Sequence, residues 1–176
     1  MELRRRGGAI WILLGIPVIA ALAGSVFAWR KFHVTDEQQE LTRYVELQVP
    51  SLLDKERAIG ERLDRLSASP GPSPIEARTL LVGDVMPRLV ALRRQAASVE
   101  AHTAPLRAIN EEYRAAVDKL IDACRTAVRA IDDPALTPEL GQKLVREKFL
   151  DAGAAERGWS IHLAEACVAA KLAPPR

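Results

Sequence analysis

The sequence has few of the residues from which catalytic centres and disulfide-stapled domains are built. Its 176 residues include two cysteines and three histidines, and only 5% of them are aromatic. Two cysteines are too few for a disulfide-stapled mini-protein or for a zinc site with four cysteine ligands. The formal net charge is +2, which argues against a nucleic-acid-binding protein of the basic-patch type. With 48% hydrophobic residues, the chain is too apolar to be disordered.

Short motifs with a known chemical mechanism are also missing from the sequence. It contains no Cys-x-x-Cys-His, no His-Glu-x-x-His, no Glu-x-x-His, no P-loop, no Gly-x-Gly-x-x-Gly and no Gly-x-Ser-x-Gly. His33, His102 and His162 are far apart along the chain, and we expect them at separate surface or juxtamembrane positions. The sequence therefore predicts no catalytic residue, no cofactor and no metal site.

One long hydrophobic run is present near the N-terminus. Residues 7–29 contain no charged side chain, and as a helix they would be about 34 Å long. That length spans the hydrocarbon core of a bilayer, which is about 30 Å thick. Basic and aromatic residues flank the run as an interfacial belt does: Arg4, Arg5, Arg6, Trp11, Trp29, Arg30 and Lys31. This pattern predicts a signal-anchor in residues 1–31, with membrane lipid around residues 7–29.

Two other interpretations of this run stay open. A cleaved signal peptide would use Val26, Phe27 and Ala28 as its cleavage region, and a buried core helix would need no membrane. A lipoprotein is excluded at this position because Ser25 stands where the lipid-bearing cysteine would have to be. The flanking charges favour the N-terminus inside and the C-terminal domain outside. The prediction is therefore a single-pass protein of the inner (cytoplasmic) membrane.

The remainder of the chain reads as an exported helical domain. Without residues 1–31 the net charge is −2, which weakens a nucleic-acid partner further. Residues 32–173 are rich in good helix formers, and their apolar residues recur every three or four positions. Residues 174–176 are a short tail. The predicted fold is all-α: an N-terminal transmembrane helix followed by an antiparallel up-down four-helix bundle.

Capping residues and turn residues predict where the four helices begin and end. The first helix starts near Thr35, with Gln38 completing a capping box, and stops at the Ser/Pro/Gly-rich segment 67–74. The second starts at a capping box of Ser73 and Glu76 and stops before residues 101–105. Thr103 and Thr137 are the expected N-caps of the third and fourth helices.

A predicted hinge layer unites two prolines with three residues of the last helix. Counting from the helix ends places Pro50 and Pro87 at the same height, near Gly153, Glu156 and Gly158. Prolines inside helices remove a backbone hydrogen bond and bend the axis. One interpretation is a hinge or small cleft with Glu156 as its polar determinant. The other is matched curvature, with Glu156 in solvent or paired with Lys119 or an arginine.

Whether the two cysteines can form a disulfide depends on whether the last helix is continuous. If it is, counting from the loop places Cys124 opposite Val145, and Cys167 about 33 Å lower. A disulfide, which needs Cα atoms within about 7 Å, then becomes impossible. If the chain folds back at Gly153–Gly158, the bridge becomes possible. We favour a continuous helix with free, buried cysteines, and we expect Tyr113 and Trp159 to serve as packing residues.

These features indicate a binding, scaffold or structural module of the cell envelope rather than an enzyme. Its partner would be another envelope protein or a second copy of itself. The arrangement resembles the anchored helical-bundle ectodomains of bacterial sensory proteins, an analogy of fold alone. The alternative is therefore a sensor-type bundle that binds a small polar molecule near Pro50, Pro87 and Glu156 and signals through a separate membrane partner. A cavity near Glu156 would favour the sensor, and an exposed apolar stripe would favour the scaffold.

Overall fold

The computed structural model describes residues 35–66 and 71–172. The chain divides into two compact units, Met1–Asp36 and Glu37–Arg176. The predicted anchor and the tail 174–176 lie outside the described residues, so both stay predictions. Within the described ranges every regular element is a helix, and none of these helices is long and apolar enough to cross a bilayer.

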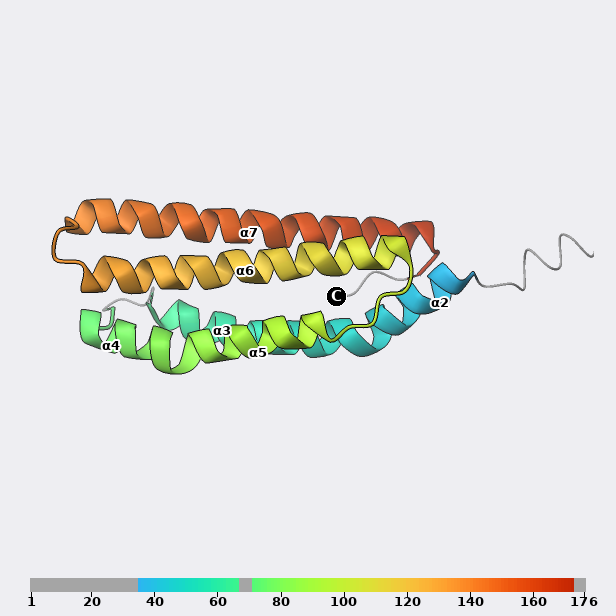
Figure 1. Ribbon diagram of the computed structural model, residues 1–176, viewed down its shortest axis with the longest axis horizontal. Coiled ribbons are helices and arrows are strands. Elements are labelled where there is room, and N and C mark those ends of the chain that lie inside the picture. Colours follow the sequence, from blue (N-terminus) through green and yellow to red (C-terminus); the bar gives the residue numbers. More distant parts are fainter. Residues whose placement is uncertain (1–34, 67–70, 173–176) are drawn as a thin grey trace, which may run out of the picture. The chain divides into compact units, whose positions relative to one another are not determined.

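The second unit is a helical bundle (Figure 1). Its first segment comprises α2 (Asp36–Arg43), η1 (Tyr44–Gln48) and α3 (Val49–Leu66), and its second comprises α4 (Pro74–Leu80), η2 (Leu81–Val85) and α5 (Met86–Ala97). The third and fourth are the uninterrupted helices α6 (Ala104–Asp132) and α7 (Pro138–Ala169). These four segments match the four predicted helices within a few residues.

Side-chain hydrogen bonds show that neighbouring segments are antiparallel. Between the first two segments, Gln95 donates to Ser51 at 3.0 Å and Arg62 donates to Asp84 at 2.6 Å. As the residue numbers increase along the first segment, the numbers of the residues that they contact on the second segment decrease. The up-down order predicted from the short connections is confirmed for these segments.

The same order holds between α6 and α7. Lys119 donates to Asp151 at 2.9 Å, and Lys148 donates to Asp122 at 2.7 Å. Cys124 therefore lies near the level of Arg146, one residue from the Val145 that the count from the loop predicts. These pairs are exposed on the surface, so each stabilises the bundle by no more than about 1 kcal/mol.

Local caps account for two of the predicted helix starts but not for a third. The capping box of Ser73 and Glu76 is complete, and Thr137 accepts a hydrogen bond from Leu140 N–H at 3.4 Å. Thr103 is the N-cap residue of α6, as predicted, but its side chain makes no capping hydrogen bond. A tertiary contact stands there instead: the Glu40 carboxylate accepts hydrogen bonds from the backbone N–H groups of His102 and Thr103.

The core follows the apolar stripes expected from the sequence. Tyr113 and Trp159 are buried against each other, with ring centroids 4.6 Å apart, which confirms their packing role. A regular spacing of three and four residues does not predict two of the core residues of the first segment, Tyr44 and Val49. They are five residues apart across η1, and the wide turn of a π-helix brings such residues onto one face.

Each proline of the bundle interior follows a π-helical turn. The turn η1 ends two residues before Pro50, and η2 ends two residues before Pro87. A proline has no N–H to donate to the carbonyl four residues earlier, and its ring clashes with that carbonyl. A wider turn relieves the clash, because it redirects the hydrogen bonds to partners five residues apart. The predicted irregularity at the prolines thus takes the form of two π turns.

Helix α7 is continuous through Gly153 and Gly158, as favoured from the sequence. Both cysteines are free and buried. After the helix, Lys171 adopts a positive φ of 59°, and Leu172 N–H bonds to the carbonyl of Cys167 at 2.8 Å. This is the hydrogen bond of a Schellman-type ending.

Candidate functional site

The predicted hinge layer does not form as one layer. Because Ser51 meets Gln95, Pro50 lies near the level of Ala96 rather than of Pro87. The two prolines are therefore offset by about 13 Å along the bundle. The prediction of equal height is wrong because it counted from the expected helix ends, whereas contacts between side chains set the register. Of the five residues, Gly153 and Glu156 line a common cavity, and Pro50, Pro87 and Gly158 do not.

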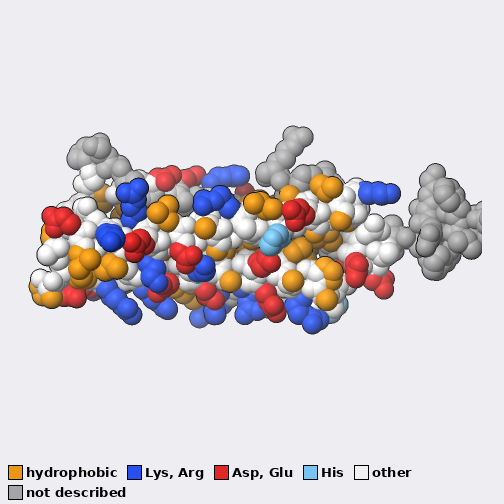
Figure 2. All heavy atoms as spheres, turned by 90° about the horizontal axis from the view of Figure 1, so that it is seen from above, with side chains coloured by type: hydrophobic (Ala, Val, Ile, Leu, Met, Phe, Trp, Pro, Cys, Tyr) orange, Lys and Arg blue, Asp and Glu red, His pale blue; other side chains and the backbone are white. Residues whose placement is uncertain are grey.

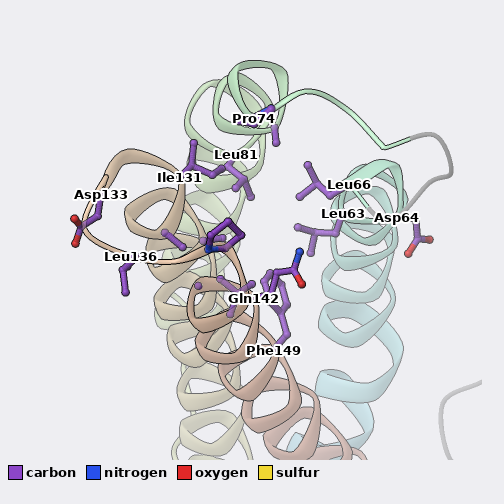
Figure 3. A pocket seen from close by; sticks show the side chains of 16 residues that line it. Leu63, Asp64, Leu66, Pro74, Leu81, Ile131, Asp133, Leu136, Gln142 and Phe149 are labelled. Atoms are coloured by element: carbon purple, nitrogen blue, oxygen red, sulfur yellow. The ribbon is translucent and has the colours of Figure 1, made fainter.

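The first of two neighbouring cavities lies at the end of the bundle where α6 meets α7. It has a volume of about 840 Å³, and we call it the tip cavity (Figure 3). Leu63 and Leu66 approach from α3, Ile131 from α6 and Phe149 from α7. The carboxylates of Asp64 and Asp133 point away from the space in Figure 3. Its walls are therefore largely apolar.

The second cavity lies further along the bundle, between α3, α6 and α7. Its volume is about 550 Å³, and we call it the acidic cavity because two carboxylates line it. Apolar side chains form most of its wall, and glycines open it further: Leu53, Ile59, Gly60, Leu63, Ala116, Val117, Leu120, Phe149, Ala152 and Gly153. Its charged lining residues are Glu56, Arg57 and Glu156.

Glu56 is the most unusual residue of the acidic cavity. Its side chain is half-buried, and its Oε2 atom is buried and has no hydrogen-bond partner among the described residues. Burial, together with the nearby negative charge of Glu156, raises the pKa of Glu56 to about 7. Both effects penalise the ionised carboxylate, because burial reduces its solvation and the like charge repels it. A group that brings a positive charge or a hydrogen-bond donor to this oxygen would be stabilised here.

Glu156 stands at the mouth of the same cavity. Its side chain is exposed, which agrees with the interpretation that it reaches solvent. It does not pair with Lys119, because that lysine binds Asp151. The other charged lining residue, Arg57, is also exposed and pairs with Asp54 at 3.5 Å.

Two glycines leave the acidic cavity open. A Cβ atom placed on Gly60 would meet nothing within 4 Å, and one placed on Gly153 would meet only the Arg157 guanidinium, at 3.5 Å. A larger side chain at Gly153 would therefore fill empty space rather than collide with backbone. Gly158, on the same helix, has nothing within 4 Å and lines neither cavity.

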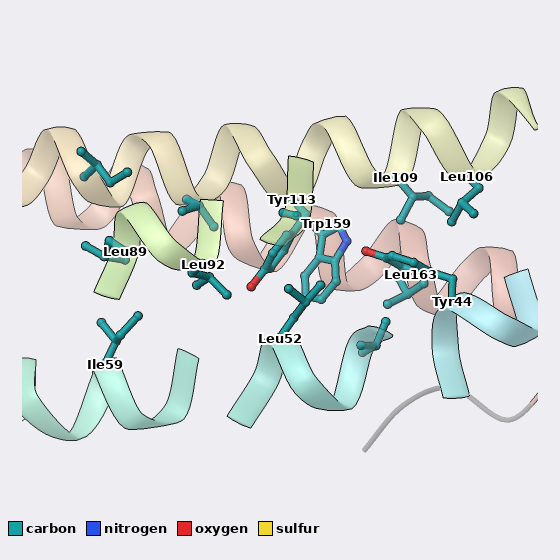
Figure 4. Packing of buried hydrophobic residues seen from close by; sticks show 14 of the residues in the cluster. Tyr44, Leu52, Ile59, Leu89, Leu92, Leu106, Ile109, Tyr113, Trp159 and Leu163 are labelled. Carbon is teal, nitrogen blue, oxygen red and sulfur yellow. The ribbon is translucent and has the colours of Figure 1, made fainter. Parts of the chain in front are cut away.

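A buried aromatic group adjoins the acidic cavity. The Tyr113 hydroxyl is fully buried, has no hydrogen-bond partner among the described residues, and points towards α3 (Figure 4). Burial raises the pKa of Tyr113, and the charges of Glu56 and Glu156 raise it further. Burial also raises the pKa of Tyr44 to about 12. The Tyr113 hydroxyl and the Glu56 Oε2 atom are therefore both buried polar atoms without a hydrogen-bond partner among the described residues.

The remaining titratable candidates lie apart from this level. His162 forms a hydrogen bond with Glu112 at 2.8 Å, and that contact raises the pKa of His162. His102 is exposed beside Glu100, and His33 lies outside the described residues. In the described part of the chain, no three histidine, cysteine or acidic side chains are grouped as metal ligands.

Sequence reasoning found Glu156 but missed Glu56, although both carry the same signature. Each carboxylate interrupts an apolar stripe: Glu56 stands between Leu52 and Ile59 at spacings of four and three, and Glu156 stands four residues after Ala152 and three before Trp159. The antiparallel packing brings the two interruptions to one cavity.

No protein-family model, no curated protein and no solved structure matches this chain.

Proposed function

We propose that this protein binds a small organic cation in the acidic cavity, as a sensor-type bundle does, and performs no catalysis. The observation that carries the proposal is the buried Oε2 atom of Glu56, which has no hydrogen-bond partner among the described residues and belongs to a side chain that lines a cavity of about 550 Å³. An unpaired carboxylate in such a place destabilises the fold. A bound ammonium or amidinium group would give that oxygen a donor and offset the repulsion from Glu156.

The remaining walls favour an organic cation over a metal ion. Leu53, Ile59, Val117 and Ala152 offer carbon surface, which suits an alkyl or aryl group. Ca²⁺ takes about six to eight oxygen ligands, and two carboxylates cannot supply that number. The volume also falls within the range of about 300–1,000 Å³ that is usual for small-molecule sites.

Calorimetry with three matched probes tests this proposal. The full-length chain in lipid nanodiscs is titrated with benzylamine, benzyl alcohol and benzoate, which share one ring and differ in charge. We expect benzylamine to bind at least tenfold more tightly than the other two. Its affinity should fall between pH 8 and pH 6, because Glu56, with a pKa of about 7, becomes protonated over that range.

Two pairs of variants locate the site. Glu56→Gln should weaken the binding of benzylamine at least tenfold. Glu61 is an exposed carboxylate on the same helix, and Glu61→Gln should leave this binding unchanged. Gly153→Leu should fill the cavity and abolish binding, and Gly158→Leu should not. Equal binding of all three probes, or equal effects within either pair, would disprove the proposal.

We further propose that residues 1–31 anchor the bundle in the inner membrane. The support is the charge-free run 7–29 and its flanking arginines. The chain should stay in the membrane pellet after carbonate extraction, and the double variant Leu13→Arg, Leu14→Arg should release it. A mature N-terminus at Trp29 in the soluble fraction would show cleavage instead.

A scaffold that docks an envelope protein or a second copy is the second candidate. The observation in its favour is a set of exposed apolar side chains on α7: Leu140, Leu144, Leu150, Ile161 and Val168. On the α7 side, however, Figure 2 shows apolar side chains interspersed with charged ones, and such scattered residues are ordinary on protein surfaces. Photo-crosslinking from position 161 in cells would capture a partner if α7 docks one.

A further inference from the structure

The tip cavity and the acidic cavity share two wall residues. Leu63 of α3 and Phe149 of α7 line both of them. The two cavities therefore lie end to end on the side of the bundle where α3 faces α7. From Glu156 to Gln142, whose side chain points into the tip cavity in Figure 3, α7 makes about four turns, or about 21 Å.

The two cavities differ in chemistry. The acidic cavity has a buried carboxylate oxygen without a partner. The tip cavity is lined by half-buried carbon side chains such as Leu66, Ile131 and Val145, and its acidic residues are exposed at the rim. The pair of cavities therefore offers carboxylates at one end and apolar surface at the other.

We propose that one amphiphilic organic cation occupies both cavities. Its ammonium or amidinium group lies between Glu56 and Glu156, and its apolar tail passes Leu63 and Phe149 into the tip cavity. The position of the charged group rests on the proposed function, whereas the tail and its compartment do not. A long tail is favoured because burying apolar area stabilises a complex, and the tip cavity, at about 840 Å³, is the larger of the two.

The test uses probes that separate head from tail. Full-length protein in nanodiscs is titrated with octylammonium, methylammonium and octanoate, and the heat of mixing with empty nanodiscs is subtracted. We expect octylammonium to bind at least tenfold more tightly than methylammonium and at least tenfold more tightly than octanoate.

Variants in the tip cavity test the tail alone. Ala127→Phe should weaken the binding of octylammonium at least tenfold and leave the binding of methylammonium unchanged. Ala115→Phe, an exposed position on the same helix, is its control. Ala77→Phe fills the tip cavity from α4 and should reproduce the result, which guards against a folding defect specific to α6. Glu56→Gln should weaken the binding of both cations.

The failures of the two proposals are distinguishable. If both cations bind equally and neither phenylalanine variant affects them, the tail compartment is disproved and the cation site stands. If octanoate binds as tightly as octylammonium and Glu56→Gln changes nothing, the tip cavity is an apolar site on its own. The amphiphilic cation is then disproved together with the proposed function.

Discussion

At the scale of single residues, the side chain of Glu56 combines burial, a like charge and an unpaired oxygen. Its pKa is about 7 in the folded chain against an ordinary value of 4.5. Below pH 4.5 the group is protonated in both states and has no effect on stability. As the pH rises to about 7, the unfolded chain releases the proton while the folded chain keeps it, so stability falls. Above pH 7 the loss is complete.

The first prediction follows from this decrease in stability with rising pH. Glu56→Gln keeps the shape of the neutral acid and removes the charge, so it should stabilise the protein by about 3 kcal/mol at pH 8 and by less than about 1 kcal/mol at pH 5. Chemical denaturation at both pH values measures the difference. Glu61→Gln, at an exposed position of α3, should show no such dependence. An equal effect of Glu56→Gln at both pH values would contradict the burial of an unpaired charge.

At the scale of elements, the two π turns explain how α-helices accept prolines in their interiors. A π turn amounts to one extra residue in an α-helix. In η2 that residue causes little disturbance, because Gly83 is exposed and a Cβ there would meet nothing within 4 Å. The flanking residues Leu81 and Val85 are both buried. The extra residue therefore sets the phase of the core positions of α5.

The second prediction tests this phase. Deleting Gly83 together with the change Pro87→Ala should convert η2 into regular α-helix, and the bundle should remain folded. Deleting Ala91 instead rotates the rest of α5 by about 100°. Leu92 and Ala96 then leave the core, at a cost of about 2–5 kcal/mol for the leucine alone. Circular dichroism melting should show a cooperative transition for the first variant and none for the second. The reverse order would show that η2 is not an insertion.

At the scale of the whole bundle, the antiparallel register separates the two thiols. Lys148 pairs with Asp122, close to Cys124, and Cys167 lies about 29 Å further along α7. Both thiols are buried, and burial raises the pKa of Cys124 to about 12 and raises that of Cys167. Neither forms the reactive thiolate in the folded chain at neutral pH.

The third prediction concerns these thiols. In the native protein neither cysteine should react with a thiol reagent within minutes, and both should react after unfolding in denaturant. The melting temperature should be the same with and without reductant. A melting temperature lowered by reductant would reveal a disulfide, and α7 would then have to be broken near Gly153.

Particular elements show how far sequence reasoning reaches. Apolar residues spaced by three and four predicted α6 and α7 almost to the residue, because a helix that must bury one face records that face in its sequence. The same spacing failed across η1, where Tyr44 and Val49 reach one face only through a wider turn. Ser73 and Glu76 were predictable because they bond within one turn. The Glu40 contact with Thr103 was not, since it joins residues far apart in the chain.

The candidate site, too, was predictable from the sequence only in part. The chain itself determined that four amphipathic helices would pack antiparallel, that α7 would continue through its glycines, and that a carboxylate would interrupt its stripe at position 156. Only the tertiary structure decided that Pro50 and Pro87 lie at different heights, that Glu56 joins Glu156, and that two cavities meet at Leu63 and Phe149. The physical reason is that stripes and caps are local properties of a helix. The sliding of one helix along another is settled by contacts between side chains, and cavities form where those contacts leave space.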